Sequence, residues 1–295
     1  MIENQFAPLK RIVAVNDLSG LGKCSLTVAL PVISATGVEC SCIPTALLST
    51  HTGEFENFIR ADLSEYMLPI ADHWQSIDLK VNGIYSGYLA SPEQGEMLES
   101  IFDRLAGSDT LLIVDPVMAD CGAYYHSFDD EMCRTFIKLC RRAHIITPNI
   151  TEAALLTGSS YKAPPHCAEY IDEILDRLLE LGPDIAALTG VQTSSDKVGV
   201  AAKSRSENTV HFSARPLRPG IFYGTGDLFA SSFSALMVRG ASLSDALETA
   251  TTLVSTSIDR SVRRNIPRRF GVDFEGALGS YIRNVELLFS QAADN

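Results

Sequence analysis

The sequence has no run of apolar residues that approaches the roughly 18–20 of a transmembrane helix, which argues against a membrane-spanning protein. Its beginning, MIENQFAPLKRIVAV, lacks the basic stretch and long apolar run of a secretory signal. Basic residues are few, since 24 Lys and Arg stand against 36 Asp and Glu and give a formal net charge of −12. That balance argues against non-specific binding of nucleic acids or anionic membranes, which need a basic surface.

Motifs of several enzyme classes are also missing. The seven cysteines are odd in number and form no CxxC pair, and the six histidines show no HxxxH or HExxH spacing. We therefore expect reduced thiols in a cytoplasmic protein, with neither a disulfide framework nor a zinc site. The sequence contains no Gly-x-Ser-x-Gly elbow, which removes the usual signature of a hydrolase.

The sequence does contain short apolar strands that alternate with helical segments. The 295 residues are 46% apolar, enough to fill a sizeable core. Strands are predicted over 10–15, 38–47, 79–84, 111–114, 144–147 and 184–188, with an antiparallel hairpin over 198–203 and 209–214. Helices are predicted over 23–36, 63–74, 92–105, 129–142, from 151, and over 166–181, 224–239, 243–256 and 275–291. The pattern predicts an α/β fold with a mostly parallel sheet, and its unbroken alternation predicts one domain over residues 1–295.

The clearest candidate site is the turn Gly224-Thr225-Gly226-Asp227, which opens an apolar helix. Ligands of parallel sheets bind beyond the carboxyl ends of the strands, and the free N–H groups of a helix start suit a phosphate. Asp227 falls in the first turn, where a carboxylate beside a phosphate can accept the proton of a substrate hydroxyl. The alternative is an acid that stabilises the helix start through the dipole.

An earlier turn over residues 19–25 resembles a P-loop only superficially. Asp17 stands where a GxxxxGK[ST] match needs its first glycine, and Cys24 stands where it needs Ser or Thr. Asn16, Asp17 and Ser19 remain able to hydrogen-bond a polar ligand at the end of the first strand. The alternative is a turn that caps the following helix.

Two further acids follow predicted strands. Asp115 comes directly after a buried strand and is a natural partner for Mg²⁺, with a plain surface turn as the alternative. The loop from there to Phe128 carries small and aromatic residues typical of a mobile lid. Glu152 falls in the first turn of a helix after Asn149, where it is either a second acid near the metal or part of the helix cap.

Three other features have both a functional and a structural explanation. His51 lies in a polar loop and is a candidate pocket residue, although a lone histidine has many structural roles. The thiol of Cys121 could add reversibly to an aldehyde, or it could be inert. The arginine-rich segment 260–269 is expected to be a solvated helix end, with a phosphate or subunit contact as the alternative.

Taken in order, five segments resemble the pyridoxal kinase branch of the ribokinase-like superfamily. They are Ser49–Gly53, Tyr85–Leu89, Asp115–Met118, Ile146–Asn149 with Glu152, and Gly224–Asp227. Each is weak alone, but all five follow predicted strands, and the resemblance covers nearly the whole chain. It implies a three-layer α/β/α ribokinase-like fold.

The resemblance also implies ATP-dependent phosphorylation of the 5′-hydroxymethyl group of pyridoxal, pyridoxine or pyridoxamine. In such an enzyme Asp227 would be the catalytic base, and Gly224, Thr225 and Gly226 would form the anion hole for the transferring phosphoryl group. Asp115 and Glu152 would lie at Mg²⁺ and the ATP phosphates, with Asn149 and Thr189 also at the ATP. The candidates for the B6 pocket are Asn16, Asp17, Ser19, His51, Thr52, Tyr85 and Cys121. A homodimer is expected by the same resemblance, and several relatives need a monovalent cation such as K⁺.

The early loop leaves other functions open. Asn-Asp-Leu-Ser-Gly at 16–20 stands where many pyridoxal kinases carry Ser-His, and it resembles the hydroxymethylpyrimidine kinases. A hydroxymethylpyrimidine kinase of the same fold is therefore the main alternative. A sugar kinase would usually carry further lid strands, which the sequence does not predict. A non-catalytic regulator that binds B6 or a nucleotide is disfavoured by the intact Asp227 and its glycine turn.

Overall fold

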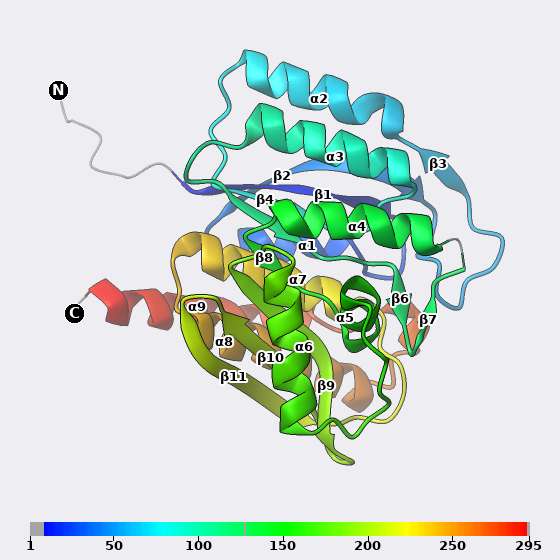
Figure 1. Cartoon of the computed structure of the whole chain (residues 1–295), viewed down its shortest axis with the longest axis vertical. Coiled ribbons are helices and arrows are strands. Elements are labelled where there is room, and N and C mark those ends of the chain that lie inside the picture. Colours follow the sequence, from blue (N-terminus) through cyan, green and yellow to red (C-terminus); the bar gives the residue numbers. More distant parts are fainter. Residues whose placement is uncertain (1–8, 127, 294–295) are drawn as a thin grey trace.

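A nine-stranded sheet forms the centre of the computed structural model, which describes residues 9–126 and 128–293 (Figure 1). The strand order is β11-β10-β9-β8-β5-β4-β1-β2-β3. The strands from β9 to β2 pair in parallel, whereas β3, β10 and β11 pair antiparallel with their neighbours. The strands are β1 (Arg11–Ser19), β2 (Glu39–Leu48), β3 (Arg60–Asp62), β4 (Gly83–Ser86), β5 (Leu111–Val114), β8 (Ile145–Ile146), β9 (Ile185–Ser194), β10 (Lys197–Ser204) and β11 (Glu207–Pro216). A separate hairpin consists of β6 (Ala119–Asp120) and β7 (Ala123–Tyr124).

Helices cover both faces of the sheet. One layer contains α2 (Ser64–Ser76), α3 (Pro92–Leu105), α4 (Asp130–Arg142), α5 (Ile150–Thr157) and α6 (Ala168–Glu180). The other contains α1 (Leu26–Ser34), α7 (Thr225–Arg239), α8 (Leu243–Arg263) and α9 (Glu275–Ala293). Alternate residues of β1 serve the two cores, since Val13 and Val15 pack under the first layer and Ile12 and Ala14 under the second. The predicted three-layer α/β/α fold, with its mostly parallel sheet and late antiparallel hairpin, is confirmed.

Helix α7 is the most enclosed helix of the second layer. Its residues from Leu228 to Leu236 are all buried, including three serines, because it packs against both α1 and α8. Its first turn lies just beyond the carboxyl ends of the parallel strands (Figure 1). A helix held on several sides in this way presents its start to the edge of the sheet as a fixed surface.

The structure moves several predicted boundaries. Helix α1 begins at Leu26 rather than at residue 23, because Gly22, Lys23 and Ser25 have positive φ angles that no α-helix accommodates. Strand β4 begins at Gly83, where pairing with β1 starts, rather than at residue 79. Helix α8 continues beyond residue 256 to Arg263, and β3 and the β6–β7 hairpin are too short to leave a pattern in the sequence.

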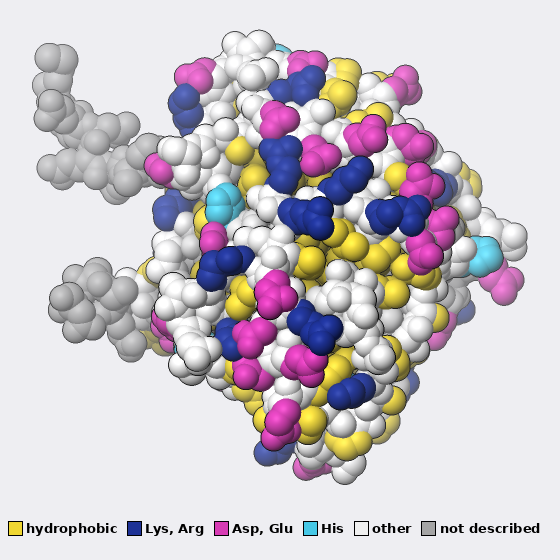
Figure 2. All heavy atoms as spheres, in the orientation of Figure 1, with side chains coloured by type: hydrophobic (Ala, Val, Ile, Leu, Met, Phe, Trp, Pro, Cys, Tyr) yellow, Lys and Arg dark blue, Asp and Glu magenta, His cyan; other side chains and the backbone are white. Residues whose placement is uncertain are grey.

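The surface is mixed in charge. Figure 2 shows acidic and basic side chains interspersed over this face of the molecule. Ion pairs of the first layer of helices include Arg142–Asp103 and Arg177–Glu173. The net charge of −12 is thus not gathered into one acidic patch on this face. Within residues 9–126 and 128–293, no helix combines the length and the apolar character that crossing a membrane requires.

Candidate active site

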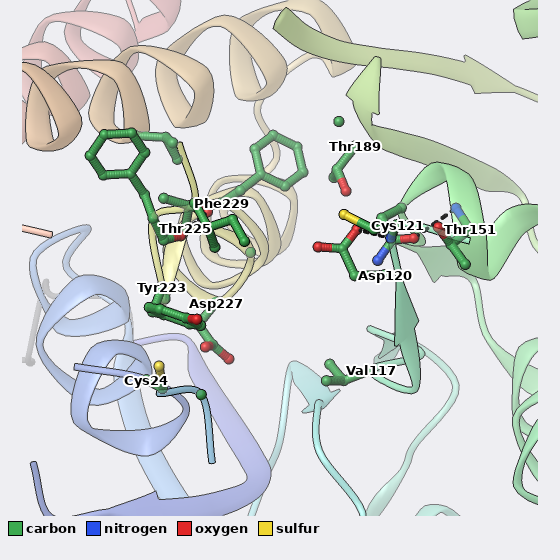
Figure 3. A pocket seen from close by; sticks show the side chains of 18 of the residues that line it. Cys24, Val117, Asp120, Cys121, Thr151, Thr189, Tyr223, Thr225, Asp227 and Phe229 are labelled. Atoms are coloured by element: carbon green, nitrogen blue, oxygen red, sulfur yellow. Dashed lines mark hydrogen bonds between the residues drawn. The ribbon is translucent and has the colours of Figure 1, made fainter. Parts of the chain in front are cut away.

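A cavity of about 1130 Å³ opens at the carboxyl ends of the parallel strands. Thirteen of the fifteen predicted site residues line it, although they come from segments spread over most of the chain. These residues are Asp17, Ser19, His51, Thr52, Asp115, Cys121, Asn149, Glu152, Thr189, Gly224, Thr225, Gly226 and Asp227. Figure 3 shows two facing walls, with Tyr223, Thr225 and Asp227 on one and Asp120, Cys121 and Thr189 on the other.

The start of α7 forms the first wall. Gly224 is its N-cap, with a left-handed φ of 77°, and a Cβ there would overlap the carbonyl oxygen of Lys23. A Cβ on Gly226 would meet no atom within 4 Å, so this residue faces open cavity. The N–H groups of a first helical turn have no acceptor within the helix. Together these features would suit an anion, and we call this turn the anion cradle.

Asp227 projects from this cradle into the cavity (Figure 3). Burial and the nearby charge of Asp17 raise the pKa of Asp227, the N–H of Ser25 and the amide of Asn16 lower it, and the net result is a pKa of about 6. A carboxyl with this pKa is ionised at neutral pH and still basic enough to accept a proton. The arrangement fits a general base beside an anion cradle.

The opposite wall also carries acids. Asp115 follows β5, and burial together with the charge of Asp227 raises the pKa of Asp115. Asp120 lies at the tip of the β6–β7 hairpin, where its Oδ1 accepts the N–H of Cys121, and it points into the cavity (Figure 3). Sequence reasoning did not single out Asp120, although it stands in the same segment as Asp115.

Glu152 has a structural task that the sequence analysis named as its alternative. It completes a capping box with Asn149, because Oε2 accepts the N–H of Asn149 at 2.9 Å and the Asn149 side chain accepts the N–H of Glu152. Its Oε1 accepts the N–H of Met118 at 3.0 Å. The carboxylate therefore fastens the segment after β5 to the start of α5, even though it also lines the cavity.

Asn149, beyond the end of β8, and Thr189, within β9, extend the contact between these neighbouring strands. The Asn149 side chain donates to the carbonyl oxygen of Ala119 at 2.7 Å, and the backbones of Asn149 and Thr189 form an isolated parallel bridge. Thr189 points toward the cavity in Figure 3. These contacts fix the wall from which the β6–β7 hairpin projects.

His51 lines the cavity with both ring nitrogens committed to backbone groups. Its Nε2 lies 2.7 Å from the carbonyl oxygen of Arg269, and Nδ1 accepts the N–H of Gly53 at 3.0 Å, so the ring is neutral with its proton on Nε2. Burial lowers the pKa of His51, which agrees with that state. The ring also stacks on Tyr223 at a centroid distance of 4.9 Å. His51 thus holds the cavity wall in shape and has no nitrogen free for a ligand.

Two predicted pocket residues, Asn16 and Tyr85, lie beneath the cavity and do not line it. Tyr85 is fully buried in the core under the second helical layer, because the alternation of side chains along β4 places it on that face of the sheet. The Oδ1 atom of Asn16 accepts the N–H groups of Asp17 and Tyr88. Tyr88, three residues beyond Tyr85 and outside β4, lines the cavity instead.

The remaining features complete the cavity. Cys121 has an exposed thiol, but the charge of Asp120 raises its pKa and disfavours the reactive thiolate. The predicted lid, in the loop from Asp115 to Phe128, contains the β6–β7 hairpin, and residue 127 lies outside the described residues. The cavity end far from Asp17 is apolar, lined by Val198, Val200, Leu217, Val254 and Ile258.

The charge balance of the cavity is acidic. Five carboxylates line it, and the two arginines that also line it, Arg215 and Arg218, are paired with Glu248 and Asp259. Within the described ranges no cluster of three or more His, Cys, Asp or Glu side chains is assembled as a ready metal site. An anionic ligand would therefore need the helix N–H groups and a cation brought with it.

This fold and site define a kinase of the ribokinase-like superfamily. A family model described as phosphomethylpyrimidine kinase matches residues 29–268, and the chain belongs to that family. The resemblance to this superfamily noted from the five segments is thereby confirmed.

Solved structures and a curated relative agree with this membership. A Bacteroides thetaiotaomicron protein, provisionally assigned as a phosphomethylpyrimidine kinase and crystallised with pyridoxal, is 34% identical with a TM-score of 0.86, over 93% of this chain and 96% of that one. Pyridoxal kinase from Lactobacillus plantarum is 30% identical with a TM-score of 0.85, over 94% and 98%. A chloroplast thiamine biosynthetic bifunctional enzyme of Arabidopsis thaliana is 29% identical over 84% of this chain. The matched region covers only 46% of that enzyme's length.

Proposed function

We propose that the protein is an ATP-dependent kinase that phosphorylates the 5′-hydroxymethyl group of a B6 vitamer. The observation that carries the proposal is Asp227, a half-buried carboxylate with a raised pKa in the first turn of the helix that forms the anion cradle. Phosphoryl transfer needs a base and a fixed anion site side by side, and little covalent chemistry from the protein. The pyridoxal held by the Bacteroides protein supports the choice of acceptor.

In the proposed reaction Asp227 removes the proton of the acceptor hydroxymethyl as its oxygen attacks the γ-phosphoryl group of ATP, and ADP leaves. Thr225 and Gly226 line the cavity, and their N–H groups would stabilise the charge on the transferring group. Burial and the nearby charge of Asp17 raise the pKa of Asp227, which favours its acceptance of the proton.

The carboxylates of the second wall fit Mg²⁺. Mg²⁺ prefers oxygen ligands and is usually held by one or two carboxylates together with substrate phosphates. Asp115 and Asp120 would hold it, because both line the cavity, whereas the Glu152 carboxylate is already bonded to backbone N–H groups. When bound, Mg²⁺ would neutralise phosphate charge that the cavity's own arginines cannot.

The two ends of the cavity suit the two substrates. The apolar end between β10 and α8, with Val200 and Val254, suits the flat base of a nucleotide. The end at Asp17 combines polar groups with the rings of His51, Tyr88 and Phe128, which suits a substituted aromatic heterocycle. The cradle at Gly226 lies between the ends, where the phosphoryl group would cross.

A hydroxymethylpyrimidine kinase is the second candidate function. The observation that favours it is Asp17, a buried carboxylate at the acceptor end, since carboxylates suit the amino group of a pyrimidine as well as they suit a pyridinium. The thiamine biosynthetic relative supports the same alternative.

The deciding experiment is an ADP-release assay with ATP and Mg²⁺ across five acceptors: pyridoxal, pyridoxine, pyridoxamine, hydroxymethylpyrimidine and ribose. We expect the highest kcat/KM with a B6 vitamer and none with ribose. A kcat/KM at least tenfold higher for hydroxymethylpyrimidine would establish the second candidate. ADP release that no acceptor stimulates would refute both kinase proposals.

A further inference from the structure

Ser25, in the turn between β1 and α1, occupies a capping position but does not cap its helix. Ser25 is the N-cap of α1, a place where a serine side chain normally accepts an N–H of its own helix. Here the side chain makes no such bond. Its hydroxyl donates instead to Oδ1 of Asp17, a contact between two buried residues. The Ser25 hydroxyl thus bonds a cavity-lining residue in place of its own helix.

The backbone of this serine is strained as well. Its φ of 55° and ψ of −129° lie in a region that residues with a side chain rarely adopt. Lys23, two residues earlier, also has a positive φ of 58°. Strain of this kind persists where surrounding contacts over-determine it, and it is concentrated at functional sites.

Close packing on three sides supplies those contacts. A Cβ on Gly224, at the cradle, would overlap the carbonyl oxygen of Lys23, and a Cβ on Gly271 would overlap that of Gly22. Gly22 in turn lies flush against the ring of His51. The turn over 22–25 is therefore wedged between the anion cradle, the segment before α9 and the acceptor end of the cavity.

Ser25 also lies close to the second acid. Its N–H lowers the pKa of Asp227, and the carbonyl oxygen of Lys23, two residues earlier, packs against Gly224 in the turn that carries Asp227. Ser25 therefore stands between Asp227 and Asp17, to which its hydroxyl donates. Figure 3 shows the neighbouring Cys24 beside Tyr223 and Asp227. The other oxygen of Asp17 accepts the hydroxyl of Ser19 at 2.8 Å, which leaves Asp17 fixed on both sides.

We propose that Ser25 is a positioning residue that sets the separation of the base Asp227 from Asp17, the carboxylate at the acceptor end. The inference rests on the proposed function, since it takes Asp227 as the base. An acceptor ring held at Asp17 then presents its hydroxymethyl group at a fixed distance from Asp227 and from the cradle. Small misplacements of reacting groups cost about a hundredfold in rate.

Two substitutions separate this role from a structural one. Ser25→Ala removes the hydroxyl and keeps the strained backbone, whereas Ser25→Gly removes the hydroxyl and relieves the strain, because glycine adopts a positive φ freely. We expect both variants to lose about ten- to a hundredfold in kcat and to raise the acceptor KM, with the KM for ATP unchanged. We expect Ser25→Gly to melt at a higher temperature than Ser25→Ala without recovering activity.

The matched control is Ser242→Ala, the same change at the N-cap of α8. Ser242 caps its own helix, accepting the N–H of Asp245 at 3.1 Å, and lies away from the cavity. We expect it to lower the melting temperature and leave the kinetic constants unchanged.

The outcomes distinguish the two proposals. The positioning role is overturned if Ser25→Gly has wild-type kinetics, or if Ser25→Ala loses stability while kcat and the acceptor KM stay unchanged. A wild-type protein that phosphorylates none of the five acceptors overturns the proposed function and this inference with it. A wild type that is active, with variants as above, supports both.

Discussion

The substitution Asp227→Asn should abolish turnover and at the same time stabilise the protein. Loss of a general base costs about 10²–10⁴ in rate, and the amide cannot accept the hydroxyl proton. The substitution also removes a desolvated charge that faces both Asp17 and Asp115. Activity and stability are thus expected to change in opposite directions, which a general disruption of the fold would not produce.

The size of the stabilisation follows from the pKa. In the folded protein the pKa of Asp227 is raised to about 6, roughly 2 above the ordinary value for aspartate. At about 1.4 kcal/mol for each pKa unit, ionised Asp227 lowers the free energy of unfolding by up to about 3 kcal/mol. Below about pH 4 the carboxyl is protonated in both states and this cost is absent. As pH rises through about 6, Asp227 ionises and lowers the free energy of unfolding of the wild type by the full amount, whereas the variant has no carboxyl to ionise there.

The assay compares wild type and Asp227→Asn by denaturant unfolding from pH 4 to pH 8, together with ADP release and ATP binding at neutral pH. The expected gain in stability is near zero at pH 4 and reaches its full value above pH 6, with ATP binding largely retained. Asp109→Asn, in an exposed turn between α3 and β5, is the control and should match the wild type throughout. A variant that keeps near-normal kcat, or one that is less stable than the wild type at pH 8, would refute the reasoning.

Three further predictions follow from the same wall and cradle. Asp115→Ala should raise the Mg²⁺ concentration needed for half-maximal activity. Glu152→Ala should mainly lower the free energy of unfolding, by about 1–3 kcal/mol, because it leaves buried N–H groups unbonded. Mg²⁺ titrations and unfolding curves distinguish the two effects. Gly226→Ala should fold normally yet raise the KM for ATP at least tenfold. Gly224→Ala should destabilise the protein, because only Gly224 has a positive φ and no room for a Cβ. Equal melting temperatures for the two variants would contradict this. Cys121→Ser should leave kcat for pyridoxal within about twofold, because Asp120 disfavours the thiolate; a larger loss would show that the thiol takes part.

The sequence predicted the architecture and most of the cavity lining because both follow from strand ends. Asp115 comes just after a strand, the glycine turn opens a helix, and Thr189 lies in β9 just past its parallel pairing with β8. Parallel strands bring their carboxyl ends to one edge. Tyr85, which the sequence also predicts as a pocket residue, does not line the cavity. It belongs to β4 itself, where alternation turns it into the core, whereas Tyr88 lies beyond the strand and reaches the cavity.

Other features depend on tertiary contacts that leave no local pattern. The turn over 22–25, where Ser25 has a positive φ, packs against Gly224 and Gly271, which are distant in the sequence. The sequence predicts either a ligand-binding turn or a capping turn there, but not this backbone conformation. The backbone bonds of His51 likewise involve Arg269, in a segment whose arginines suggested a solvated helix end. The segment does contain the end of α8, at Arg263, and is largely exposed, while Arg260 and Arg264 also pair with Asp273 at the approach to α9.

The bond between His51 and Arg269 has a consequence for how the protein is made. The acceptor end of the cavity joins groups 218 residues apart, and the Lys23 side chain reaches the carbonyl oxygen of Val272 across 249. Chains rich in such distant contacts fold slowly, and contacts to late residues cannot form until those residues have been synthesised. A nascent chain that has just completed α7 would possess the anion cradle without its acceptor pocket. Catalytic competence should therefore arise abruptly, once the segment before α9 has left the ribosome.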